Sequence, residues 1–137
     1  ALLNQVMVLL LRRSLVSMNA WVERFSVLKD PLVAKAFAEM AMRPADDHSL
    51  QSLAHTACLS RSAFAARFTE AIGKAPMQVL RELRLRQAMF QLKGSGLAID
   101  LVARNAGYAS RSSFTKAFRR TYGIEPSAVR RDDATAV

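Results

Sequence analysis

Cationic and hydroxyl side chains gather in two short runs of this 137-residue chain. The tripeptide Ser-Arg-Ser occupies residues 60–62 and returns, fifty residues later, at residues 110–112. An arginine guanidinium binds anionic oxygens through paired N–H donors, and a serine hydroxyl both donates and accepts hydrogen bonds. The two runs therefore predict binding to an anionic partner that also carries hydrogen-bonding groups.

Both runs belong to a longer internal repeat. Seven residues recur with identical types fifty positions later: Ser60, Arg61, Ser62, Phe64, Phe68, Gly73 and Pro76 return as Ser110, Arg111, Ser112, Phe114, Phe118, Gly123 and Pro126. Upstream, four small or apolar residues recur forty-nine positions later: Leu50, Leu53, Ala54 and Ala57 return as Ile99, Val102, Ala103 and Ala106. The extra residue falls between Gly107 and Ser110, in a turn, where insertions disturb packing least. The chain thus contains two copies of one unit.

Each copy has the pattern of two helices joined by a tight turn. In the first copy, Ser49 and Ser60 are placed to cap helices over 50–57 and 61–72 by accepting backbone N–H bonds, and Gly73 ends the second helix. The second copy has Asp100 near the start of its first helix, Gly107 in the turn, Ser110 as a cap and Gly123 as the stop.

Phenylalanines predict the buried face of the second helix in each copy. Phe64 and Phe68 are four residues apart, as are their counterparts in the second copy, so each pair lies on one helix face. The small residues Ala54 and Ala103 allow the first helix to approach the second, which a crossing angle of about 90–120° requires. Each copy is therefore interpreted as a helix-turn-helix.

A long helix is expected to separate the copies. Pro76 suits a first helical turn, and no other Pro or Gly interrupts the chain before Gly94. Four residues share one face at helical spacing: Leu85, Ala88, Met89 and Leu92. The predicted helix over 76–92 would be about 25 Å long at 1.5 Å per residue.

Two runs carry a resemblance to a known family: SLQSLAHTACLSRSAFAARFTEAIGKAP and IDLVARNAGYASRSSFTKAFRRTYGIEPSAVR. With the helix between them, they resemble the C-terminal DNA-binding domain of AraC/XylS-type transcriptional regulators. The second run is the more specific, through its Gly-Tyr pair, its F-x-R-x-Y-G ending and its P-S-x-x-R tail. The resemblance covers about 80 residues, 50–129.

The resemblance implies a bacterial, sequence-specific transcription factor that binds double-stranded DNA. Such proteins are usually activators, which implies contact with RNA polymerase, and an effector-binding or dimerising domain often precedes the DNA-binding domain. The chain opens with Ala rather than Met, so we expect a fragment whose N-terminal sensor domain is missing. The long helix would hold two recognition helices near the ~34 Å repeat of DNA, so that both enter the major groove on one face.

Site residues follow from the resemblance and from helix geometry. The positions expected to face base edges are Ser62, Ala63, Ala66, Ser112, Ser113 and Lys116. Because long polar side chains are common in the family where Ala63 and Ala66 stand, the first unit is expected to read bases by methyl contact or chiefly to hold the DNA backbone. The positions expected to contact phosphates are Ser49, Arg61, Arg67, Asp100, Arg111, Arg119 and Arg120, with Ser49 and Asp100 acting through backbone N–H groups at helix starts.

Charge agrees with this interpretation without deciding it. Residues 1–48 hold 6 Lys/Arg against 5 Asp/Glu, whereas 49–137 hold 14 against 6. Such an excess attracts any polyanion, including RNA and anionic membranes. The alternative function is therefore a basic helical module that binds a protein partner or a polyanion without sequence specificity.

Catalytic and metal chemistry find little support in the sequence. His55 and Cys58 are three residues apart, but two ligands do not make a metal site, and Cys58 is interpreted as a small residue packed in the turn. The segment 94–96, Gly-Ser-Gly, lacks the pattern of a phosphate loop or a nucleophile elbow. We expect no enzyme activity, no metal and no cofactor. The single cysteine excludes an internal disulfide and suits a reducing cytoplasm.

The N-terminal third predicts further helices. Residues 2–16 are apolar but too short and too polar for a membrane span, and a second helix is expected near 20–28. Asp30-Pro31 is a helix start, and the helix over 31–42 is expected to pack on the first helix-turn-helix. The sequence thus predicts an all-α chain with five parts: an N-terminal helical segment 1–30, a first helix-turn-helix subdomain 31–75, a linker helix 76–93, a second subdomain 94–131 and a tail 132–137. The N-terminal segment is expected to form a homodimer interface, through residues 1–28, or to be the remnant of the missing domain.

Overall fold

The computed structural model describes residues 30–135, and every regular element in this range is an α-helix. The helices are α2 (Pro31–Met42), α3 (Leu50–Thr56), α4 (Arg61–Ile72), α5 (Pro76–Gly94), α6 (Ile99–Asn105), α7 (Arg111–Tyr122) and α8 (Pro126–Thr135). The expected all-α fold is confirmed. The helices expected over 2–16 and 20–28, and the dimer interface placed there, lie outside the described residues. Among those that are described, no helix has the length and apolar character that a membrane crossing needs.

The first half of the fold is a core shared by α2, α3, α4 and the N-terminal half of α5. The expected packing of the helix over 31–42 on the first helix-turn-helix is confirmed, because α2 contacts both α3 and α4. Phe64 and Phe68 are fully buried in this core, with ring centroids 5.5 Å apart. The other buried residues are Val33, Ala36, Phe37, Met40, Leu53, Ala54, Ala57, Val79, Leu80 and Leu83.

A second core repeats the arrangement with α6, α7, α8 and the C-terminal half of α5. Phe114 and Phe118 are fully buried, and their ring centroids lie 5.6 Å apart, which matches the pair in the first core. The other buried residues are Leu85, Ala88, Leu92, Val102, Ala103, Ala106 and Val129. Of the four residues predicted to share one face of the linker helix, three are buried and Met89 is half-buried. The internal repeat in the sequence is therefore a repeat in structure.

The helix boundaries follow the capping residues that the sequence predicted. The Ser60 hydroxyl accepts a hydrogen bond from the Ala63 N–H at 3.2 Å, and Ser110 accepts one from the Ser113 N–H at 3.1 Å. Gly73 ends its helix in the left-handed conformation, with φ of 87°. A left-handed residue without a Cβ carries no steric penalty, so the helix stops there.

As expected, Asp100 lies near the start of α6, in the first turn after the N-cap Ala98. Two features differ from the expectations. Cys58 is exposed rather than packed in the turn, and its φ of 57° is left-handed, because it occupies the place that Gly107 fills in the second unit. Residues 132–135, expected as tail, continue α8, whose Arg130 Nη1 donates to the Leu97 carbonyl.

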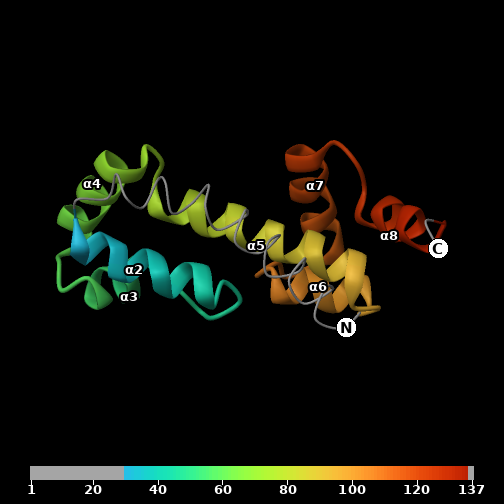
Figure 1. Cartoon of the computed structure of the whole chain (residues 1–137), viewed down its shortest axis with the longest axis horizontal. Coiled ribbons are helices and arrows are strands. Elements are labelled where there is room, and N and C mark those ends of the chain that lie inside the picture. The colour runs from blue at the N-terminus through green and yellow to red at the C-terminus, as the bar shows by residue number, and fades with distance from the viewer. Residues whose placement is uncertain (1–29, 136–137) are drawn as a thin grey trace, which may run out of the picture.

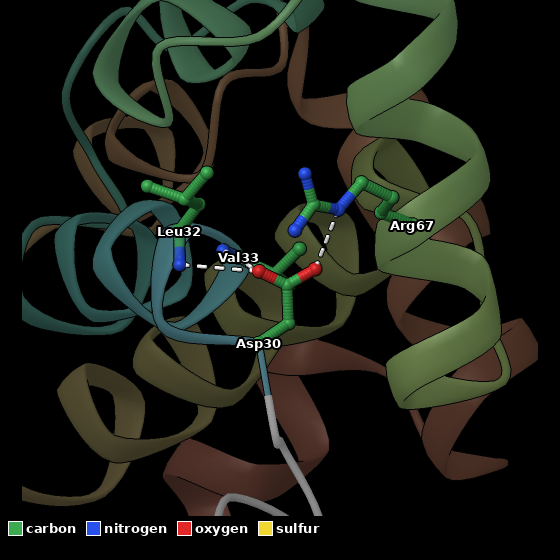
Figure 2. Close-up of polar contacts among 4 residues, drawn as sticks. All are labelled: Asp30, Leu32, Val33 and Arg67. Carbon is green, nitrogen blue, oxygen red and sulfur yellow. Dashed lines mark hydrogen bonds and ion pairs between the residues drawn. The ribbon is translucent and has the colours of Figure 1, made fainter.

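Asp30 joins the start of α2 to α4. One carboxylate oxygen accepts hydrogen bonds from the Leu32 and Val33 N–H groups at 3.2 and 3.4 Å, and the other lies 2.7 Å from Arg67 Nε (Figure 2). Partial burial raises the pKa of Asp30, but the hydrogen bonds from Arg67 and the two amides outweigh it, and the pKa lies below its ordinary value. The carboxylate is thus a helix cap and an ion-pair partner at once.

Asp30→Asn tests this double role. Because the pKa is depressed in the folded state, the carboxylate stabilises the fold above its unfolded pKa, and this contribution is lost as pH falls through the folded pKa. Asparagine keeps a cap acceptor but removes the charge that faces Arg67. We expect the variant to have a lower free energy of unfolding than the wild type at pH 7, with the difference shrinking below about pH 4. Urea unfolding followed between pH 7 and pH 3 measures this, and a difference that is constant over the range contradicts it.

The two separate cores predict separate responses to large-to-small substitution. Phe64→Ala and Phe114→Ala should each cost about 3–5 kcal/mol, because each leaves a cavity around a fully buried ring. We expect Phe64→Ala to accelerate amide hydrogen exchange mainly in α2, α3 and α4, and Phe114→Ala mainly in α6, α7 and α8. The same acceleration throughout both halves in both variants would show one cooperative core instead.

Candidate nucleic-acid interface

The faces of α4 and α7 opposite the buried phenylalanines are open to solvent. On α4, Ser62 and Ala66 are exposed, and Ala63 is half-buried. On α7, all three expected base-facing residues are exposed: Ser112, Ser113 and Lys116. Each helix begins at a serine cap and buries two phenylalanine rings on its inner side. This packing leaves the opposite face exposed. The described chain therefore presents two similar helix surfaces to a partner.

The two surfaces differ in charge. Helix α7 holds Arg111, Lys116, Arg119 and Arg120 with no acidic residue, whereas α4 holds Arg61, Arg67 and Glu70. Lys116, Arg119 and Arg120 line one open hollow on the surface. The electrostatic attraction for an anion is therefore concentrated on α7.

Acidic residues near α7 neutralise its cations only weakly. Arg119 Nη1 lies 3.7 Å from Glu125 Oε1, and Arg111 Nη1 lies 3.9 Å from Asp100 Oδ1. All four side chains are more than half exposed, with fractions between 51% and 67%, so water and salt screen both pairs. Both arginines are accessible to an anionic partner. A carboxylate at Asp100 would repel that partner, so only its backbone N–H suits the contact expected there.

Three other expected contact groups are hydrogen-bonded within the chain. Arg67 is held by Asp30, the Ser49 N–H donates to Ser52 Oγ at 2.9 Å, and Ser113 Oγ accepts a hydrogen bond from Ser110 Oγ at 2.9 Å. An incoming phosphate or base would have to displace or share these contacts. Groups that must give up such hydrogen bonds gain less on binding than groups that need not.

The structure also brings together groups that the sequence analysis did not associate. Gln51 and His55 of α3 share a shallow surface hollow with Arg61, at the start of α4. His55 was considered above only as a metal ligand. Within the described residues, no three His, Cys, Asp or Glu side chains lie close enough to hold a metal ion. Gln51 and Arg61 are ten residues apart and on opposite sides of a turn, so no helical spacing in the sequence predicts that they lie together.

Helix α5 separates the two surfaces. Helix α4 lies at one end of α5 and α7 near the other (Figure 1). The 19 residues of α5 correspond to about 28 Å at 1.5 Å per residue, which is close to the ~34 Å length of one DNA helical turn.

Comparison with known proteins identifies the relatives of this chain. A family model described as a helix-turn-helix domain matches residues 53–132. An AraC-like transcription regulator of Streptomyces lividans is 33% identical over 130 residues, which are 95% of this chain and 42% of that protein. The RCS-specific transcriptional activator RclR of Escherichia coli K12 is 34% identical over 122 residues, 89% of this chain and 43% of that protein. The chain thus spans about two fifths of the length of these relatives.

Solved structures agree with these sequence relatives. The DNA-binding domain of the global transcriptional factor AdpA, crystallised in complex with a target DNA, is 34% identical with a TM-score of 0.69, and the match covers 76% of this chain and 93% of that one. An AraC-type DNA-binding domain protein from Chromobacterium violaceum shares the fold, with a TM-score of 0.70 at 24% identity over 76% of this chain and 93% of that one. The chain has two repeated units joined by one helix, and it matches these relatives and solved structures. It therefore belongs to the AraC/XylS family of DNA-binding transcriptional regulators.

Proposed function

We propose that this chain reads a specific DNA sequence by inserting α4 and α7 into successive segments of the major groove on one face of the duplex. One observation carries the proposal: the same capped helix over a phenylalanine pair is built at both ends of a single continuous helix. A helix-turn-helix places its second helix in the major groove, and two such helices about one helical turn apart face the same side of DNA. The relative crystallised in complex with a target DNA supports binding to double-stranded DNA by this fold.

Base recognition is assigned to the exposed N-terminal halves of the two helices. Lys116 is the strongest candidate, because its ammonium can donate to acceptors on a base edge, with Ser112 beside it. On α4, Ser62 offers one hydroxyl, and Ala66 offers only a methyl group, which suits the methyl of thymine. Ala63 and Ser113 complete the two sets. The second unit therefore supplies more hydrogen-bonded discrimination than the first.

Phosphate contact is assigned to the exposed arginines. Arg61 and Arg111 stand in the first turns of α4 and α7, and Arg119 and Arg120 stand at the end of α7. Arg67 contributes only if it leaves Asp30, and the amides of Ser49 and Asp100 contribute at helix starts. Such contacts hold the protein in register but carry no sequence information.

The complete protein is proposed to be an activator in the cytoplasm that contacts RNA polymerase. The printed description of the relative RclR as a transcriptional activator supports this role. We place an effector-binding or dimerising domain outside this chain, because the relatives are more than twice as long as their matched portions. No enzymatic activity is proposed.

Selection of the chain against a random duplex library, at near-physiological salt, tests the proposed function. We expect an enriched motif of two blocks about one helical turn apart. Salt-sensitive binding without an enriched motif would contradict specific reading and favour a basic module that binds polyanions. No binding to any duplex would favour a protein partner.

Lys116→Ala should change which base is preferred at one position of the second block. Loss of a direct base contact removes about 1–3 kcal/mol of discrimination, or about 5- to 150-fold in relative affinity between the preferred base and its alternatives. Competition binding with single-base variants of the selected duplex measures this. Equal weakening on every duplex would show that Lys116 contacts a phosphate.

Arg119→Ala and Arg120→Ala should weaken binding to all duplexes alike. Each lost phosphate contact lowers the magnitude of the slope of log K against log salt by about one. Lys93→Ala is the matched control, because Lys93 is an exposed cation at the end of α5, outside both recognition helices, and its loss should leave the slope unchanged. A change of base preference in either arginine variant would contradict the phosphate assignment.

A further inference from the structure

Arg84 occupies the point of α5 where the two cores meet. Its neighbour Leu83 is buried in the first core, and Leu85 on its other side is buried in the second. The Arg84 side chain belongs to neither apolar cluster, and its guanidinium extends instead to backbone groups on both sides. Neither the repeat nor the hydrophobic pattern of the sequence singles out this residue.

Two nitrogens of the guanidinium bind the first unit. Arg84 Nε donates to the Pro44 carbonyl at 2.7 Å, and Nη2 donates to the Asp46 carbonyl at 2.9 Å. Both carbonyls lie in the loop between α2 and α3, about forty residues away along the chain. Hydrogen bonds from a charged donor to carbonyls are stronger than neutral ones, and the planar guanidinium fixes the angle between the two. The α2–α3 loop is thereby held against the middle of α5.

The third nitrogen faces the second unit. A Cβ built on Gly107 would lie 2.9 Å from Arg84 Nη1 and 3.3 Å from Cζ, so the guanidinium rests directly on this glycine. Gly107 forms the turn between α6 and α7 with φ of 87°, a conformation that favours glycine independently. Arg84 therefore contacts the loop of one unit and the helix-turn-helix turn of the other at the same time.

The main helix packing between the two units runs through α5. In the part of the chain that the structure describes, every closely packed pair of helices lies within one unit or includes α5. The angle between the units depends on the backbone of α5 and on side chains that touch both, and Arg84 is such a side chain.

We propose that Arg84 is a positioning residue that fixes the orientation of the two helix-turn-helix units relative to each other, and so sets the spacing between the two base blocks that the chain accepts. The inference rests on the proposed function for its DNA readout. Arg84 itself touches no base in this account. It acts by keeping α4 and α7 in one relative position.

Arg84→Met and Arg84→Lys test the proposal on DNA. Methionine keeps an unbranched apolar stem, and lysine keeps the charge but cannot supply the same planar fork to two carbonyls. The matched control is Lys93→Met, which removes the same charge from an exposed site on the same helix. The probes are the selected two-block duplex, duplexes whose gap between blocks is one or two base pairs longer or shorter, and a duplex with a single block.

The wild type and Lys93→Met should prefer one gap length by about tenfold or more, because a rigid pair of helices fits only one spacing. In Arg84→Met this preference should fall to about threefold or less, with affinity for the single-block duplex within about twofold of that of Lys93→Met. Arg84→Lys should be intermediate. Retention of the wild-type gap preference in Arg84→Met would overturn the proposal.

A distance measurement without DNA separates this proposal from the proposed function. Spin labels at Thr69→Cys on α4 and Thr121→Cys on α7, both exposed positions, report the separation of the recognition helices, with Cys58→Gly removing the native thiol. We expect a single narrow distance distribution with Arg84 and a clearly broader or shifted one with Arg84→Met, at a temperature where circular dichroism shows both to be folded. An unchanged distance distribution in Arg84→Met overturns the proposed role of Arg84. A broadened distribution supports that role even if the chain selects no two-block motif. In that case only the proposed DNA reading is contradicted.

Discussion

One continuous helix that belongs to two cores is the constraint on which the rest of the structure depends. The N-terminal half of α5 contributes Val79, Leu80 and Leu83 to the first core, and its C-terminal half contributes Leu85, Ala88 and Leu92 to the second. Because both sets lie on one uninterrupted backbone of 19 residues, neither unit can bury its apolar face without fixing its place along α5. The separation of α4 from α7 is thus a consequence of core packing.

Each unit separates a buried stabilising face from an exposed face on the same short helix. Fully buried phenylalanines hold α4 and α7 in place, and the opposite sides carry serine, alanine, lysine and arginine. The division lets the exposed residues differ between units while the packing stays the same. The cations concentrated on α7 and the small residues on α4 show this, because one scaffold carries two different surfaces.

Local rules predicted the helices and their ends, because those features depend on residues within one or two turns. Serine at 60 and 110, and glycine at 73 and 123, mark the boundaries of α4 and α7, and the phenylalanine pairs mark their buried faces. Contacts between distant residues could not be predicted from the sequence. Asp30 binds Arg67, and Arg84 binds the α2–α3 loop. Each contact joins groups about forty residues apart, so neither produces a periodic pattern in the sequence. The prediction that Cys58 is packed in the turn was wrong. Its equivalent in the second unit is Gly107, and the structure shows that Cys58 shares the positive φ of that glycine and has an exposed side chain.

In the proposed complex, two helices of one chain read the major groove on one face of DNA. Methylation interference on the selected duplex tests it most directly, because methylation of guanine N7 blocks the major groove and methylation of adenine N3 blocks the minor groove. We expect two clusters of interfering guanine N7 positions about 10 base pairs apart on the same face of the duplex. A single cluster, or interference confined to adenine N3, would contradict it.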